Sequence, residues 1–330
     1  MKVVLAPMEG LADFHLRQIL TSVGGYDHCV TEFIRVSNQL LPNRVFYRSC
    51  PELYNGGRTF SGTPTHLQLL GSDPVLMAEN AARAADLGAT AIDINFGCPA
   101  KTVNKNMGGS RLLQYPEVVF NIVDAVRKAV PQSVPVTAKM RLGFKDKSLA
   151  VENAQAIESA NANGLTIHAR TKTEGYKPPA HWHWIAIIKE NINLPVIANG
   201  EIWNLDDYEQ CVKESTCEDV MIGRGAITKP DFPLLIKQRQ QQYKEHHFQA
   251  SLQQYPQDMA WPEVKTLLSN YYGLLSCQDT PLIVHPNYIP GRLKQWTSFL
   301  MNHYSEAGVL FHQIKREKNP AIIHRQILNT

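Results

Sequence analysis

Short hydrophobic runs recur along the first 225 residues and are separated by stretches with helical periodicity. Most runs are continuous rather than alternating, which is typical of strands buried on both faces of a parallel sheet. The eight predicted strands are Val3–Ala6, Cys29–Phe33, His66–Leu70, Ala91–Asn95, Val134–Met140, Leu165–Ala169, Pro195–Ala198 and Asp219–Ile222. Helices that end at glycine, proline or polar stop signals are predicted at Pro74–Leu87, Pro116–Val130, Leu149–Asn163 and Leu205–Ser215. This rhythm predicts a (β/α)₈ TIM barrel, with a doubly wound sheet as the alternative.

Polar and glycine residues gather at one end of each predicted strand, which favours the barrel. In a barrel these ends converge on the carboxyl-terminal mouth, where active sites of this fold lie, whereas an open sheet would spread them along an edge. The residues at the strand ends are Pro7, Met8, Glu9, Glu32, Gln68, Asn95–Cys98, Lys139, Arg141, His168, Arg170, Asn199–Glu201 and Gly223–Gly225.

The alternation of strands and helices stops after Gly225. Residues 237–254 are polar and rich in glutamine, as in a linker or a solvated helix. From Trp261 onward the pattern is helical, with further helices predicted at Arg292–Tyr304 and Pro320–Leu328. We therefore expect two domains, a catalytic barrel over residues 1–242 and an all-helical domain over residues 243–330.

Composition narrows the class of protein. The six cysteines form no CxxC pair, and the pairs His181/His183 and His246/His247 have no carboxylate or cysteine at ligand spacing, so neither a disulfide framework nor a metal site is expected.

The amino-terminal apolar run is too short for a signal peptide, and no stretch of about 18 apolar residues predicts a membrane span. We expect a cytoplasmic monomer with reduced thiols that does not associate with membranes. The net charge of +3 comes entirely from residues 231–330, a weak excess for a nucleic-acid surface.

Two glycine loops predict a phosphate site. Asn199-Gly200-Glu201 and Gly223-Arg224-Gly225 follow the seventh and eighth predicted strands, where barrels frequently bind phosphate, although tight turns alone would also explain the glycines. No Rossmann fingerprint or P-loop motif occurs. Flavin mononucleotide suits such a mouth: Lys139 and His168 would stabilise negative charge on the reduced ring, and Gln68 would hydrogen-bond its pyrimidine edge.

Cys98 differs from the other cysteines because it follows a strand, between Gly97 and Pro99, at the catalytic face. A thiol of ordinary pKa is mostly protonated at neutral pH, so it can donate a proton to a developing carbanion, and its thiolate can attack a carbon. Both roles remain open from the residues alone.

Six segments together resemble the tRNA-dihydrouridine synthases over most of the first 240 residues. They are Ala6–Gly10, Asn95–Pro99 with Lys101-Thr102-Val103, Lys139–Gly143, His168–Thr171, Asn199–Ile202 and Met221–Gly225. Thr31–Val36 and Arg292–Trp296 are similar to the bacterial C branch of that family, which implies uridine 16 of the tRNA D-loop as the target.

The resemblance implies a reaction and its residues. The barrel would hold FMN, NADPH would reduce it, and hydride would pass to C6 of the uridine while Cys98 protonates C5. The residues that match flavin-contacting positions are Pro7, Met8, Glu9, Gln68, Lys139, His168, Asn199, Gly200, Glu201, Gly223 and Arg224. The helical domain would hold the tRNA.

The expected tRNA contacts lie in two places. Arg35, Asn95 and Tyr176 are expected near the flipped nucleotide, and Arg292 and Lys294 are expected on phosphates, with Trp296 as a stacking face. Two alternatives stay open: an FMN-dependent reductase of a small pyrimidine or enone, and a tRNA-binding protein without catalysis.

Overall fold

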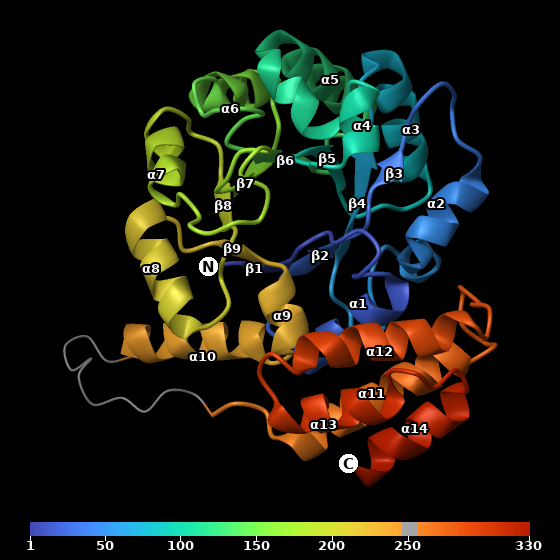
Figure 1. The fold of residues 1–330 in the computed structure, drawn as a ribbon. Helices are drawn as coiled ribbons and strands as arrows, with labels where there is room; N and C mark the ends of the chain where they lie inside the picture. The colour runs from blue at the N-terminus through green and yellow to red at the C-terminus, as the bar shows by residue number, and fades with distance from the viewer. Residues whose placement is uncertain (246–256) are drawn as a thin grey trace.

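The computed structural model describes residues 1–245 and 257–330, and its core is a closed barrel of eight parallel strands (Figure 1). Pairing between β2 and β4 closes the ring, and a short extra strand, β3 (Ile34–Arg35), pairs with β4. The barrel strands are β1 (Val3–Leu5), β2 (His28–Val30), β4 (Thr65–Leu70), β5 (Ile92–Phe96), β6 (Val136–Arg141), β7 (Gly164–His168), β8 (Val196–Asn199) and β9 (Val220–Ile222). The predicted TIM barrel is confirmed.

One predicted strand differs from the structure. The run Cys29–Phe33 ends as a strand at Val30, because the residues after it bind elsewhere. The Thr31 hydroxyl accepts the backbone N–H of Gln68 at 3.0 Å, and the Glu32 carboxylate accepts that of Gly10 at 2.5 Å. These bonds turn the chain over the mouth of the barrel.

Helices surround the barrel, and their boundaries follow local sequence signals. Asp73 caps α3 and Pro74 occupies its first turn, where a missing N–H costs nothing. The barrel helices are α1 (Phe14–Val23), α2 (Asn43–Ser49), α3 (Pro74–Asp86), α4 (Lys101–Lys105), α5 (Pro116–Ala129), α6 (Ala150–Ser159), α7 (His183–Glu190), α8 (Leu205–Ser215), α9 (Arg224–Thr228) and α10 (Phe232–Glu245), with 3₁₀ turns at Pro51–Asn55 and Gly109–Gln114.

The described residues from 257 onward form only helices: α11 (Trp261–Ser276), α12 (Tyr288–Leu300), α13 (Ser305–Ile314) and α14 (Pro320–Asn329). Here α12 packs against α9, and α11 packs against α1 (Figure 1). The predicted start of α12 at Arg292 was wrong by four residues, because Pro290 is tolerated in a first helical turn. Helix α10 runs through the expected boundary at residue 243, so the division into 1–242 and 243–330 stays a prediction. The end of the polar stretch 237–254 lies outside the described residues.

Arg292 and Trp296 join the helical region to the barrel. The Arg292 guanidinium donates to the carbonyls of Gly10, at 2.8 Å, and Leu11, and it forms an ion pair with Asp13 at 3.2 Å. The Trp296 indole is buried and donates to the carbonyl of Ile227 at 3.1 Å. Both side chains therefore face the barrel and not the solvent.

Candidate active site

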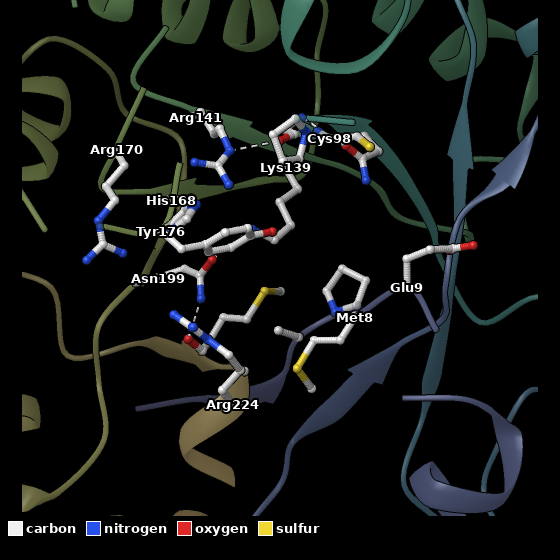
Figure 2. A pocket seen from close by; sticks show the side chains of 18 of the residues that line it. Met8, Glu9, Cys98, Lys139, Arg141, His168, Arg170, Tyr176, Asn199 and Arg224 are labelled. Carbon is white, nitrogen blue, oxygen red and sulfur yellow. Dashed lines mark hydrogen bonds between the residues drawn. The ribbon is translucent and has the colours of Figure 1, made fainter. Parts of the chain in front are cut away.

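The mouth of the barrel opens into a cavity of about 320 Å³ (Figure 2). The structure brings all the predicted cofactor and catalytic residues into its wall. Of the predicted site residues, those that line it are Pro7, Met8, Glu9, Gln68, Asn95, Cys98, Lys139, His168, Tyr176, Asn199, Gly200, Glu201, Gly223 and Arg224. In Figure 2, Cys98 and Glu9 lie on one side of this cavity, and Arg170 and His168 lie on the other.

Cys98 is held at the cavity wall as a protonated thiol. Its backbone N–H and that of Gly97 both donate to the Asn95 side-chain oxygen, at 2.9 and 2.8 Å. Burial raises the pKa of the Cys98 thiol, the Glu9 carboxylate raises it further, and Arg141 and Arg35 only partly oppose this. Near neutral pH the group is therefore a proton donor rather than a thiolate.

Lys139 is a buried lysine in the wall of the cavity. Its ammonium is buried and donates to the Asn199 side-chain oxygen at 2.8 Å. Burial lowers the pKa of Lys139 to about 7, helped by the nearby Arg141. The lysine is thus poised between its charged and neutral forms, and an anionic ligand beside it would favour the charged form.

His168 lies in the cavity wall as an uncharged side chain. Burial, and then the surrounding cations led by Arg141, hold the pKa of His168 well below its usual value. A neutral imidazole can still stabilise a negative ligand by donating its ring N–H as a hydrogen bond, so the expected role of His168 stays a prediction.

Gly200 lets the backbone approach His168 closely. Its φ is +115°, and a Cβ added there would lie 2.7 Å from the imidazole Cδ2. No other residue fits this conformation without displacing the ring. The glycine of the motif Asn199-Gly200-Glu201 therefore allows close packing against His168 as well as a turn.

We expect Gly200→Ala to destabilise the protein by more than the backbone cost of about 1–3 kcal/mol, because His168 must also move. Gly62→Ala is the matched control, since Gly62 has a φ of +87° and open space around its Cα. The free energies of unfolding in urea give the comparison. Equal losses in the two variants would show that the contact with His168 is unimportant.

Arg224 and Tyr176 form an aromatic and cationic wall. The Arg224 guanidinium lies 4.8 Å from the Trp203 ring centroid and 5.1 Å from that of Tyr176. Stacking between two rings fixes the plane of the guanidinium, which favours a bidentate contact with a phosphate or carboxylate. Tyr176 is exposed at the mouth, although the Arg141 guanidinium also lies 5.1 Å from its ring centroid.

Arg141, expected at the mouth but given no role there by the sequence, bridges two loops of the site. It donates to the carbonyls of Gly97 at 2.9 Å, Thr171 at 3.1 Å and Gly175 at 2.8 Å, and it lies over the Tyr176 ring. It thereby ties the Cys98 loop to the Tyr176 loop. Its place two residues after Lys139 on β6 is the signal that could have assigned it to the site, since alternate residues share a face of a strand.

Four of the residues expected to contact tRNA lie outside the cavity. Arg35 is exposed on β3, near enough to affect the Cys98 thiol. Arg292 is bound to the barrel, and its burial argues against the expected phosphate contact. Trp296 is too buried to stack on a base. Lys294 is half-buried, and its ammonium donates to the carbonyl of Glu317 at 2.8 Å, which leaves it other protons to donate.

The described residues contain neither a candidate membrane span nor a candidate metal cluster. No helix in the ranges 1–245 and 257–330 is long and apolar enough to cross a membrane. The same ranges hold no cluster of three or more histidine, cysteine or acidic residues that could bind a metal ion.

Solved structures share the fold at low sequence identity. A complex of 2-naphthoyl-CoA reductase superposes with a TM-score of 0.55 at 14% identity, over 72% of this chain and 50% of that one. The protein TcOYE, solved with pHBA, superposes with a TM-score of 0.52 at 12% identity, over 85% and 95% of the two chains. At these identities the likenesses show the fold alone.

Sequence comparison is more specific. The tRNA-dihydrouridine(16) synthase of Pseudomonas putida is 49% identical over 98% of this chain and 96% of its own length. That of Aquipseudomonas alcaligenes is 48% identical over 97% of this chain and 96% of its own length. The family model described as Dihydrouridine synthase (Dus) matches residues 4–276. By these matches and by the residues that line its cavity, the chain belongs to the dihydrouridine synthase family.

Proposed function

We propose that this protein reduces uridine 16 in the D-loop of tRNA to 5,6-dihydrouridine, with FMN as cofactor and NADPH as reductant, acting as a cytoplasmic monomer. The observation that carries the proposal is the Cys98 thiol, kept protonated at the wall of a cavity that is cationic on its opposite side. The names of the relatives, all nearly full-length matches, support the position of the uridine.

The chemistry of the cavity fits FMN. Lys139, neutral His168 and Gln68 supply hydrogen bonds and one positive charge to a flat polar ring, and Arg224 beside Gly223 suits a phosphate. Gly200 gives the close backbone approach that a buried ring needs. When bound, FMN supplies the hydride for carbon C6 of the base.

The protein supplies the proton and the position of the base. Cys98 donates its proton to C5, and the Asn95 side chain fixes the loop that carries it. Tyr176, Arg35 and Asn95 border the path of a nucleotide turned out of its stack, and Lys294 offers a phosphate contact from the helical region. We assign Arg292 instead to holding the two regions together.

Mapping of dihydrouridine in cellular tRNA tests the function. Dihydrouridine at position 16 should disappear when the gene is deleted and return with the wild-type gene, but not with Cys98→Ala. Loss at another D-loop position would contradict the assignment of uridine 16. An unchanged dihydrouridine pattern would contradict the function, and reduction of free uracil by the purified protein would favour a small-substrate reductase. Comparison of NADPH and NADH oxidation rates tests the reductant.

Binding of FMN to the apo-protein should weaken as the pH rises from 7 to 9. The pKa of Lys139 is about 7 in the free protein, and flavin-ring acceptor atoms that take a hydrogen bond from its charged ammonium would raise it in the complex. Binding therefore takes up a proton above pH 7, which weakens affinity by up to about tenfold per pH unit. Fluorescence titration measures this, and the window lies above the phosphate titration near pH 6. The Lys139→Met variant should bind FMN weakly and with little dependence on pH. A pH dependence as steep as that of the wild type would show that another group takes up the proton.

A further inference from the structure

A layer of polar side chains crosses the interior of the barrel beneath the mouth. Strand register places Gln68 of β4 and Thr137 of β6 on either side of Asp93 of β5, and Asn95 is the next inward residue of β5. All of these except Thr137 are buried, in a barrel whose interior is usually filled by branched apolar residues. Buried polar groups are costly unless they are hydrogen-bonded, so the bonds between them decide how each group is oriented.

The Cys98 loop fixes the orientation of the first amide. The backbone N–H groups of Gly97 and Cys98 can only donate, so the Asn95 atom that faces them, at 2.8 and 2.9 Å, must be the oxygen. Its amide nitrogen then faces Gln68, at 2.7 Å, and must meet an oxygen there. The Gln68 amide is thereby oriented with its nitrogen toward Asp93.

Asp93 fixes the same orientation from the other end. Its carboxylate accepts the Gln68 nitrogen at 2.7 Å and the Thr137 hydroxyl at 2.6 Å. Burial raises the pKa of Asp93, while these two donors and the charge of Lys139 oppose that rise. The row of bonds from Thr137 to the Cys98 loop therefore has one direction, and it depends on an acceptor at position 93.

We propose that Asp93 is a positioning residue for the proton donor, acting through Gln68 and Asn95 on the loop that carries Cys98. This inference rests on the proposed function. Without an acceptor at position 93, the Gln68 amide nitrogen loses its hydrogen bond, so nothing holds the amide in this orientation. If the amide rotates, its nitrogen faces the Asn95 amide nitrogen, and two donors then meet. Rotation of Asn95 would then set N–H groups against the N–H groups of Gly97 and Cys98, and the loop would lose its anchor.

Two variants of Asp93 distinguish the loss of its hydrogen-bond acceptor from the loss of its negative charge. Asp93→Leu removes the acceptor, and a second cavity of about 290 Å³ that Asp93 also lines gives the larger side chain room. Asp93→Asn keeps an acceptor, because its oxygen can face Gln68 while its nitrogen donates to the Thr137 hydroxyl. The leucine variant should therefore release the loop, and the asparagine variant should largely retain it.

The first readout needs no cofactor. Alkylation of Cys98 by iodoacetamide in the apo-protein, followed by mass spectrometry of its peptide, should be several-fold faster in Asp93→Leu and near the wild-type rate in Asp93→Asn. The second readout mixes dithionite-reduced holoenzyme with unmodified tRNA. Reoxidation of the flavin should slow by about a hundredfold in Asp93→Leu, since misplacement of a reacting group by 1 Å costs that much.

A swap tests the direction of the bonds even if Asp93→Leu fails to fold. Gln68→Glu sets two carboxylates against each other, and combining it with Asp93→Asn restores a donor and an acceptor between the two positions. Cys98 alkylation should rise in the single variant and return toward the wild-type rate in the double variant. Asn153→Leu is the control, since this buried amide donates to the Leu113 carbonyl outside the layer. It should lower stability and leave Cys98 alkylation unchanged.

The outcomes are distinct. Wild-type alkylation and reoxidation rates in a folded Asp93→Leu variant, or a double variant that alkylates as fast as Gln68→Glu, would overturn the inference. Failure of tRNA to reoxidise the reduced wild-type protein would instead overturn the proposed function, and the alkylation of the apo-protein would still decide the role of Asp93.

Discussion

Replacement of Cys98 by alanine should abolish most turnover while leaving the ligands bound. General acid catalysis contributes about 10²–10⁴-fold, so dihydrouridine formation should fall by about that factor. The side chain is half-buried, and the bonds that hold its loop come from the backbone and from Asn95, so its removal leaves the cavity in place. Radiolabelled or mass-spectrometric measurement of dihydrouridine in purified tRNA gives the rate.

Binding measurements and a second cysteine control this experiment. FMN absorbance and the dissociation constant for tRNA should match those of the wild type, because only the proton donor is removed. Cys277→Ala should behave as the wild type, since that cysteine is exposed and outside the cavity. Undiminished product from Cys98→Ala would refute its role as the acid.

Arg292→Ala should cost about 3–5 kcal/mol of stability, the usual loss when one partner of a buried ion pair is removed. Asp13 would lose its cationic partner, and the carbonyls of Gly10 and Leu11 would lose a charged donor. The variant should also bind tRNA more weakly, because the helical region would no longer be fixed to the barrel. Thermal and urea unfolding measure the first effect.

Lys294→Ala is the matched comparison for Arg292. Its ammonium makes one bond to a backbone carbonyl at a partly exposed position, so its loss should leave stability nearly unchanged. If Lys294 contacts a tRNA phosphate, the variant should reduce the salt dependence of tRNA binding by about one counterion. Wild-type stability of Arg292→Ala would contradict the proposed joining role.

The barrel could be predicted because most of its strands are continuous apolar runs and several of its helices are followed closely by glycine or proline. Each of the eight predicted runs overlaps one barrel strand, and the strand ends carry the residues that meet in the cavity. Local pattern could not predict the end of β2 at Val30, since bonds from Thr31 and Glu32 to distant parts of the chain decide it.

The surroundings of Arg292 and His168 could not be predicted from the sequence. Arg292 looks like a surface cation in a helical segment, and only the packing of α12 against the barrel shows that Gly10, Leu11 and Asp13 surround it. The lowered pKa of His168 likewise depends on burial and then on cations from neighbouring strands and loops. Both are consequences of tertiary proximity, which periodicity along the chain does not contain.

The three carbonyl contacts of Arg141 have a consequence for how this barrel can vary among related sequences. One guanidinium spans two loops that follow different strands, at Gly97 on one side and at Thr171 and Gly175 on the other. An insertion or deletion in either loop would move the carbonyls of that loop away from the guanidinium, which could then no longer bind both loops. The two loops are thus expected to change length together across homologues, with lysine a poor substitute at position 141 because its single ammonium cannot reproduce the fork.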